Sequence, residues 1–249
     1  MKKIACITGA SSGIGRATAQ SLANEGFQLI LCGRRKERLE ELQASLSVNS
    51  ILLTFDVSNQ TSVIQAFESL PAEWKNIDVL VNNAGNAHGM SAIQDRDAAD
   101  WDAMMASNVT GLLYVSKEVI KGMVERKLGH IINLSSIAGK QTYPNGNVYC
   151  ASKAAVEALS AGMRQDLNPF GIKVSNVAPG AVATEFSEVR FKGDQAKAEA
   201  VYAGYEPLVA ADVAELIRYI VSAPAHVNIA DVTILPTAQA SAFQILRKN

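Results

Sequence analysis

The sequence predicts an α/β fold built as one domain around a doubly wound parallel sheet. Short apolar runs alternate with longer amphipathic stretches along the chain, and the runs are apolar throughout. Parallel strands have this pattern because helices cover both faces of their sheet. The length of 249 residues fits one large α/β domain, and no linker or change of composition divides it.

The elements follow in chain order. Apolar runs predict strands at 3–8, 28–33, 51–56, 78–83, 130–135 and 173–179. Helical spacing predicts helices at 13–26, 35–46 and 149–167. A more polar stretch at about 185–207 breaks the rhythm, and we expect an irregular substrate loop or lid there. The whole chain, 1–249, is therefore expected to be one domain that contains this insertion.

Composition limits the classes of partner. The formal net charge of -1 gives no basic surface for nucleic acid or an anionic membrane, so a small-molecule substrate fits better. No apolar run reaches the roughly 18 residues that a membrane span needs. The three cysteines are an odd number and give no disulfide framework, so we expect a cytoplasmic protein. The three histidines lack metal-ligand spacing, and no metal is predicted.

Ligands of a doubly wound sheet bind beyond the carboxyl ends of its strands. The first expected strand ends in a glycine-rich loop that runs straight into a helix. Its glycines let the backbone approach a phosphate, and the helix N-terminus favours an anion. The alternative is an ordinary turn, since the spacing is not the tighter G-x-G-x-x-G. The candidate nucleotide-binding residues here are Gly9, Ser11, Ser12, Gly13, Ile14 and Gly15.

The second expected strand ends in Gly33, Arg34 and Arg35. Dinucleotide folds that prefer NAD usually place an acidic residue where Gly33 stands, whereas a guanidinium group favours a 2′-phosphate. The cofactor predicted is therefore NADP(H), although the two arginines could instead open a solvated helix. Asp56, at the end of the third strand beside Val57, is expected to contact the adenine amino group, to cap the next helix, or to do both.

Further motifs in the same order resemble those of the short-chain dehydrogenase/reductase family along nearly the whole chain. The matching residues are Thr8 to Gly15, Asn82 to Gly85, Asn108, Ser136, Tyr149 with Lys153, and Pro179 with Gly180 and Thr184. The resemblance implies a Rossmann-like fold, a homotetramer and a catalytic set of Asn108, Ser136, Tyr149 and Lys153. It implies further cofactor contacts from Asn83, Ala84, Gly85, Tyr149, Lys153, Pro179, Gly180, Val182 and Thr184.

The chemistry of the catalytic set follows from residue type. Tyr149 and Lys153 are four residues apart and share one face of a helix. We expect the Lys153 ammonium to lower the pKa of Tyr149, so that the phenol exchanges a proton with the substrate oxygen while Ser136 hydrogen-bonds that oxygen. The resemblance adds that Lys153 binds the nicotinamide ribose and that Asn108 holds a water chain. Ser135 competes with Ser136, which the family pattern selects.

The stretches 184–194 and 224–240 resemble a subgroup of this family that oxidises 3-hydroxy acids, serine and L-allo-threonine with NADP. This resemblance implies a carboxylate on the substrate, for which Arg190 is the first candidate partner and Lys192 the second. Both could instead lie on a solvated loop. Three residues between Ser136 and Tyr149 are expected either to line the pocket or to form turns: Gln141, Asn145 and Asn147.

Other functions remain open. Reduction of 3-oxoacyl thioesters, or of small ketones and dicarbonyls, uses the same catalytic set. A protein that only senses NADP(H) would keep the fold without turnover, but it would not need Ser136, Tyr149 and Lys153 together.

Overall fold

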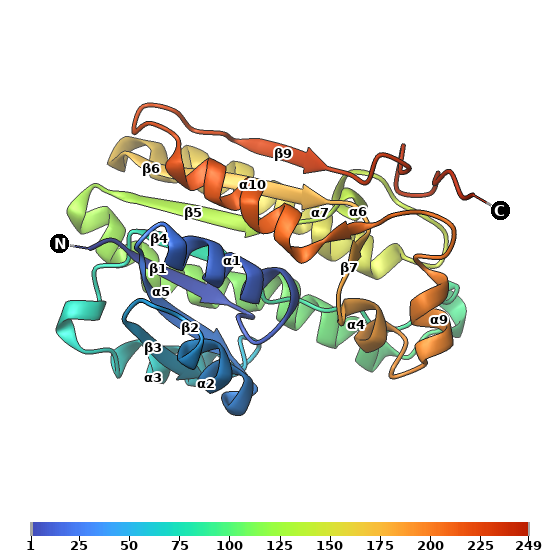
Figure 1. Ribbon diagram of the computed structural model, residues 1–249, viewed down its shortest axis with the longest axis horizontal. Coiled ribbons are helices and arrows are strands. Elements are labelled where there is room, and N and C mark those ends of the chain that lie inside the picture. The colour runs from blue at the N-terminus through green and yellow to red at the C-terminus, as the bar shows by residue number, and fades with distance from the viewer. Residues whose placement is uncertain (1, 249) are drawn as a thin grey trace.

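The computed structural model describes residues 2–248, in which seven parallel strands form one central sheet (Figure 1). The strand order is β3-β2-β1-β4-β5-β6-β9, and it reverses between β1 and β4. The strands are β1 (Ile4–Thr8), β2 (Gln28–Gly33), β3 (Ser50–Thr54), β4 (Val79–Asn82), β5 (Gly129–Leu134), β6 (Ile172–Pro179) and β9 (Asp231–Ile234). The predicted doubly wound fold is confirmed, and its topological switch point lies between β1 and β4.

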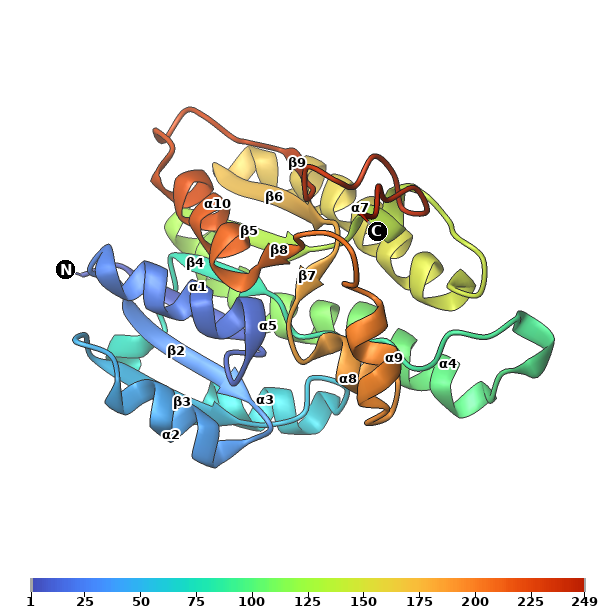
Figure 2. The same ribbon diagram turned by 45° about the vertical axis from the view of Figure 1, so that its right-hand side comes forward.

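The helices lie on both faces of the sheet (Figures 1 and 2). They are α1 (Gly13–Asn24), α2 (Lys36–Ala44), α3 (Gln60–Glu68), α4 (Ala98–Met105), α5 (Gly111–Arg126), α6 (Ile137–Lys140), α7 (Asn147–Leu167), α8 (Phe186–Arg190), α9 (Gln195–Ala200) and α10 (Ala210–Ser222). Short 3-10 turns are η1 (Ala72–Trp74), η2 (Ile93–Asp95) and η4 (Asn168–Phe170), and η3 (Ala106–Thr110) is π-helical. Helices α1, α2 and α10 pack on one face, and α3, α5 and α7 pack on the other.

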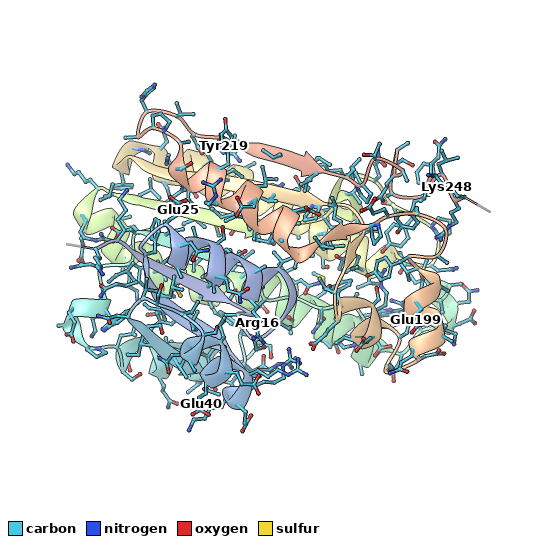
Figure 3. All side chains as sticks on the ribbon, viewed as in Figure 1. Arg16, Glu25, Glu40, Glu199, Tyr219 and Lys248 are labelled. Atoms are coloured by element: carbon cyan, nitrogen blue, oxygen red, sulfur yellow. The ribbon has the colours of Figure 1, made fainter. Side chains whose placement is uncertain are left out.

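The uniform apolar character of the inner strands follows from this layering. In β1, Ala5 and Ile7 point into the core under α1 and α10, whereas Ile4 and Cys6 point into the core under α3 and α5. Successive side chains of a strand face opposite ways, so a strand covered on both sides buries all of them. Side chains on the outer faces of the helices, such as Glu40 and Tyr219, project away from the sheet (Figure 3).

The segment after β6 differs from its prediction. An irregular loop was expected at about 185–207, but the structure forms α8 and α9 there, next to a small parallel pair of β7 (Val182–Ala183) and β8 (Leu208–Val209). The carboxylate of Asp194 caps α9 by accepting a hydrogen bond from the Lys197 amide at 3.1 Å. Tyr202 fixes both helices to the small sheet by donating to the Val182 carbonyl at 2.8 Å and bonding the Ser187 hydroxyl at 2.6 Å.

The ends of the strands carry the connecting segments that matter for a ligand. The chain between β4 and α4 and the segment with α8 and α9 lie at the same end of the molecule, beyond the carboxyl ends of the strands (Figure 2). Within residues 2–248, no helix is long and apolar enough to cross a membrane. The three cysteines of this part of the chain are buried free thiols.

Candidate active site

A cavity of about 520 Å³ opens at the carboxyl ends of the strands and spans the switch point between β1 and β4. Most of the predicted cofactor and catalytic residues line it: Gly9, Ser11, Ser12, Gly13, Ile14, Arg34, Arg35, Asp56, Val57, Asn83, Ala84, Gly85, Ser136, Tyr149, Lys153, Pro179, Gly180, Val182 and Thr184. Residues from one end of the sequence to the other thus meet around one space.

The glycine-rich loop forms the floor of the cavity, and its glycines are required by geometry. Gly9 has a φ of 67°, a left-handed conformation that side chains disfavour. Gly15 lies behind the lining, where an added Cβ would be 2.3 Å from the Gly9 carbonyl oxygen. Thr8 holds the neighbouring loop, because its hydroxyl accepts hydrogen bonds from the amides of Asn83 and Ala84 at 3.0 Å. Backbone is thereby exposed where a phosphate would need close approach.

Two arginines border the far end of this cavity. The Arg35 guanidinium donates to the hydroxyls of Ser11 and Ser12 and to the carboxylate of Glu185 at 2.9 Å. Arg38, which the sequence reading did not single out, donates to the same carboxylate. Arg34 is more exposed and pairs with Asp56 at 3.5 Å. Three guanidinium groups therefore surround the end of β2, and Glu185 partly neutralises two of them.

Asp56 forms a turn and leaves the capping of α3 to a neighbour. Its Oδ1 accepts hydrogen bonds from the amide and hydroxyl of Ser58 at 2.9 and 2.7 Å. The cap of α3 is Asn59, which accepts from the Ser62 amide at 3.0 Å, so the suggested capping role of Asp56 was wrong. Burial raises the pKa of Asp56, but the bonds from Ser58 and the charge of Arg34 outweigh burial and keep that pKa below its usual value.

Three of the predicted catalytic residues, Ser136, Tyr149 and Lys153, meet at the other end of the cavity, and all three are buried. Helix α7 places Tyr149 and Lys153 one turn apart, and the Lys153 amine donates to the Leu134 carbonyl at 2.8 Å. Ser136 caps α6 by accepting from the Ala138 amide at 3.1 Å, and its hydroxyl donates to the Pro179 carbonyl at 3.3 Å. The rival Ser135 instead donates to Glu157 at 2.6 Å.

Asn108 does not line the cavity but fixes one of its walls. It lies in the π-helical turn η3, which widens the helix locally. Its side chain accepts from the Asn86 amide and donates to the Asn86 carbonyl, both at 2.8 Å, and it donates to the Ser152 hydroxyl at 3.0 Å. Asn108 thus joins the chain after β4 to the helix that carries Tyr149.

The electrostatics of Tyr149 differ from the sequence-based expectation. Burial raises the pKa of Tyr149, and the cation that opposes this rise is Arg190, with the Ser136 side chain acting in the same direction. The Lys153 ammonium, which is expected to lower this pKa, donates its hydrogen bond to the Leu134 carbonyl, and its effect on the phenol stays a prediction. Burial also lowers the pKa of Lys153 to about 8, although the Glu157 carboxylate acts in the opposite direction.

The substrate candidates separate into two groups. The Cζ atom of Arg190 lies 4.9 Å from the centre of the Tyr149 ring, and its Nη2 donates to the Tyr143 hydroxyl at 2.6 Å. Arg190 is therefore beside the phenol, although it lies outside the lining of the cavity. The other candidates make contacts elsewhere: Gln141 accepts from the Ala242 amide, Asn147 accepts from the Val148 amide, Asn145 accepts from Arg96 through its carbonyl, and Lys192 pairs with Asp100.

Sequence reasoning missed several residues around Tyr149. Tyr143 and Phe186 pack in the same cluster as Tyr149, and the guanidinium of Arg190 lies over both rings. A signal for Tyr143 was its position between Ser136 and Tyr149. Phe186 belongs to α8, which had been expected as an irregular loop, so no pattern placed it near the phenol.

Comparisons with known proteins give a consistent answer. The family model described as short chain dehydrogenase matches residues 3–195. An NADP-dependent 3-hydroxy acid dehydrogenase of Escherichia coli is 43% identical over 240 residues, which cover 96% of this chain and 97% of that protein. Sulfoacetaldehyde reductase 2 of Chromohalobacter salexigens is 45% identical over 251 residues, which cover 99% of this chain and 100% of that protein.

A solved structure agrees with these relatives. The closed form of a serine dehydrogenase complexed with NADP+ superposes with a TM-score of 0.94 at 42% identity, and the match covers 99% of this chain and 100% of that one. The motifs, the topology and these matches agree over almost the full length. The chain belongs to the short-chain dehydrogenase family.

Proposed function

We propose that this protein is an NADP-dependent dehydrogenase that interconverts the hydroxyl and carbonyl forms of a small acid, with a 3-hydroxy acid such as serine, L-allo-threonine or 3-hydroxypropionate as the substrate. One observation carries the proposal: the Arg190 guanidinium lies 4.9 Å from the centre of the Tyr149 ring. A cation this close to the proton-transferring phenol suits a substrate whose acid group is only a few bonds from its hydroxyl.

The cavity fits a dinucleotide with a 2′-phosphate. NADP would lie along the glycine-rich loop, with the 2′-phosphate near Arg34 and Arg35, and when bound it supplies the hydride chemistry. The remaining contacts proposed for it are those from Gly9, Ser11, Ser12, Gly13, Ile14, Gly15, Asp56, Val57, Asn83, Ala84, Gly85, Tyr149, Lys153, Pro179, Gly180, Val182 and Thr184.

The catalytic roles are assigned as follows. Tyr149 takes the hydroxyl proton of the substrate in oxidation and returns it in reduction. Ser136 donates a hydrogen bond to the same substrate oxygen and stabilises the charge that develops there. Lys153 binds the ribose hydroxyls and keeps the local potential positive. Asn108 maintains a path for proton exchange, with Gln141, Asn147 and Arg190 on the substrate side.

A second candidate is reduction of a sulfonate-bearing aldehyde, because sulfoacetaldehyde reductase 2 shares 45% identity with this chain. A sulfonate and a carboxylate both present several oxygens to a guanidinium group, so Arg190 serves either acid. Reduction of 3-oxoacyl thioesters or small ketones uses the same catalytic residues, but it gives Arg190 no acid partner. A non-catalytic NADP(H) sensor would not need the catalytic residues at all.

We also propose a homotetramer in the cytoplasm, with α5 and α7 as the pairing helices. The surface proposed for this pairing is an open apolar hollow. It is bordered by Leu113, Ile120 and Val124 of α5 and by Met163 of α7. Symmetric assembly buries such a surface against its own copy.

The test follows absorbance of the reduced nicotinamide when the purified protein meets NADP+ and a panel of hydroxy compounds. The panel contains L-serine, L-allo-threonine, 3-hydroxypropionate, 3-hydroxybutyrate and 2-hydroxyethanesulfonate, with NAD+ in parallel. Oxidation of one or more acids with NADP+ and much less with NAD+ is expected. Silence with the whole panel, together with NADPH-dependent reduction of a 3-oxoacyl thioester, would reject the proposal, and tight NADPH binding without any turnover would favour the sensor.

A further inference from the structure

Four buried side-chain nitrogen atoms have no hydrogen-bond partner among residues 2–248. They are Nε and Nη1 of Arg96, Nε1 of Trp101 and Nε of Arg190. The other buried side-chain atoms without partners in the described chain are all oxygens. Because buried donors are nearly always satisfied in folded proteins, three donor side chains with the same defect call for a common explanation.

The three side chains belong to one wall of the site. Trp101 packs in the cluster that contains Tyr149, and Arg190 lies over the Tyr149 ring. The backbone joins Arg96 to this wall through Gly89, whose amide donates to the Arg190 carbonyl at 2.6 Å. A Cβ on Gly89 would lie 3.4 Å from Nη2 of Arg96, so this guanidinium is next to the loop segment that contacts Arg190.

Local charge leaves both arginines without an anion. Asp100 lies beside Gly89, as the Arg96 guanidinium does, but it pairs with Lys192 at 3.0 Å and forms no ion pair with Arg96 or Arg190 among the described residues. Among the described residues Lys192 is therefore paired with a carboxylate, whereas Arg96 and Arg190 are a surplus of positive charge without an ion-pair partner. The pKa of the Tyr143 phenol is affected by the same surplus of positive charge. Burial raises this pKa, and the charges of Arg190 and Arg96 both oppose the rise.

We propose that Arg96 is a specificity-determining residue, which joins Arg190 in a two-guanidinium site for the acid group of the substrate, a carboxylate or a sulfonate. The proposal rests on the proposed function and deepens it. Nη1 of Arg96, Nε of Arg190 and Nε1 of Trp101 supply donors from three side chains for the oxygens of one acid group. An acid on the substrate would give each of these three side chains an acceptor, whereas a neutral ketone or thioester would leave most of their donors unpaired.

The kinetic test compares the wild type with Arg96→Gln and Arg96→Lys, and with Arg218→Gln as a matched control on the outer face of α10. The substrates are 3-hydroxypropionate and its uncharged isostere 3-hydroxypropionamide, each with NADP+. Arg96→Gln should raise KM for the acid about 10- to 100-fold with little change in kcat, and should leave the amide within about twofold. Arg96→Lys should recover part of the loss, and the control should match the wild type. An equal loss for acid and amide, or no loss for the acid, would overturn the proposal.

A binding measurement separates this proposal from the proposed function. Propionate, ethanesulfonate and propionamide cannot be oxidised at a hydroxyl, so their binding is measured as the rise in melting temperature with NADP+ present. The wild type should be stabilised by at least one of the two acids and not by propionamide, and Arg96→Gln should lose that stabilisation. The acid that raises the melting temperature more identifies the preferred acid group, carboxylate or sulfonate. If the hydroxy acids are not turned over but this binding is seen and depends on Arg96, the proposed reaction fails and the acid site stands. Equal stabilisation of the wild type and Arg96→Gln would reject the acid site.

Discussion

The amine of Lys153 donates a hydrogen bond to the carbonyl oxygen of Leu134 at 2.8 Å, where β5 ends beneath the cavity. This bond holds a buried ammonium within one helical turn of Tyr149, and burial lowers its pKa to about 8. A cation in this position is costly to the fold, and we expect it to be useful to the reaction. The first two predictions separate these two consequences.

Tyr149→Phe should remove the proton donor and acceptor while keeping the packing of the ring. We expect kcat to fall by about 100-fold or more, which is the usual scale of general acid–base catalysis. NADPH affinity, measured by the fluorescence of the bound nicotinamide, should stay within about twofold. A variant that retains the wild-type rate would show that the phenol is not the proton-transferring group.

Lys153→Met should abolish most turnover and yet stabilise the fold near neutral pH. A shift of the Lys153 pKa from 10.5 to about 8 corresponds to about 3 kcal/mol of unfavourable burial. The cost is fully present below pH 8 and is relieved as the pH rises from about 8 towards 10.5, because the unfolded chain then binds the proton more strongly. The unfolding free energies of wild type and variant, measured in denaturant, should differ most below pH 8 and converge above it. A difference that does not change with pH would contradict the burial effect.

The guanidinium groups after β2 should set the cofactor preference. Arg34→Ala and Arg35→Ala should each weaken NADPH binding about 10-fold or more, because an ionic hydrogen bond to the 2′-phosphate is lost. NADH binding should change much less in both variants. Lys36→Ala, which removes an exposed cation paired with Glu40, serves as the control. Equal weakening of NADPH and NADH by the arginine variants would remove the 2′-phosphate assignment.

Glu185 forms ion pairs with arginines that a 2′-phosphate would need as partners. Its carboxylate pairs with Arg35 at 2.9 Å and also with Arg38. Glu185→Gln should therefore tighten NADPH binding and slow NADPH dissociation, with a smaller effect on NADH, as measured by stopped-flow fluorescence. The sign is the critical result: weaker NADPH binding in this variant would mean that Glu185 orders the arginines instead of competing for them.

The six strands expected from the sequence are all present, because each has an apolar run. The five inner strands are buried on both faces, whereas β3 lies at an edge and is only partly buried. The seventh, β9, at the other edge of the sheet, was not predicted because Asp231 and Thr233 alternate there with less exposed residues. Its pattern is that of a strand with one solvated face, which the search for continuous apolar runs does not detect. Helices α8 and α9 were missed because five- and six-residue helices carry little periodicity.

The residues of the site also divide into those that were predictable from the sequence and those that were not. Residues whose roles depend on the local backbone, such as Gly9 in its left-handed turn and Tyr149 one helical turn from Lys153, were predictable from spacing. Arg96 and Glu185 were not, because each acts through partners that are 49 and 150 residues away in the chain. The pKa of Tyr149 also depends on tertiary contacts, since Arg190 is brought to the ring by α8.

The most direct test of an acid-selective site beside Tyr149 is the kcat/KM of NADP+-dependent oxidation of 3-hydroxypropionate by the wild type and by Arg190→Gln. We expect measurable turnover by the wild type and a loss of about 100-fold in the variant, mainly through KM, because the acid group loses its guanidinium partner. An Arg190→Gln enzyme with the wild-type kcat/KM would contradict this function, as would a wild type that reduces 3-oxoacyl thioesters but oxidises no hydroxy acid.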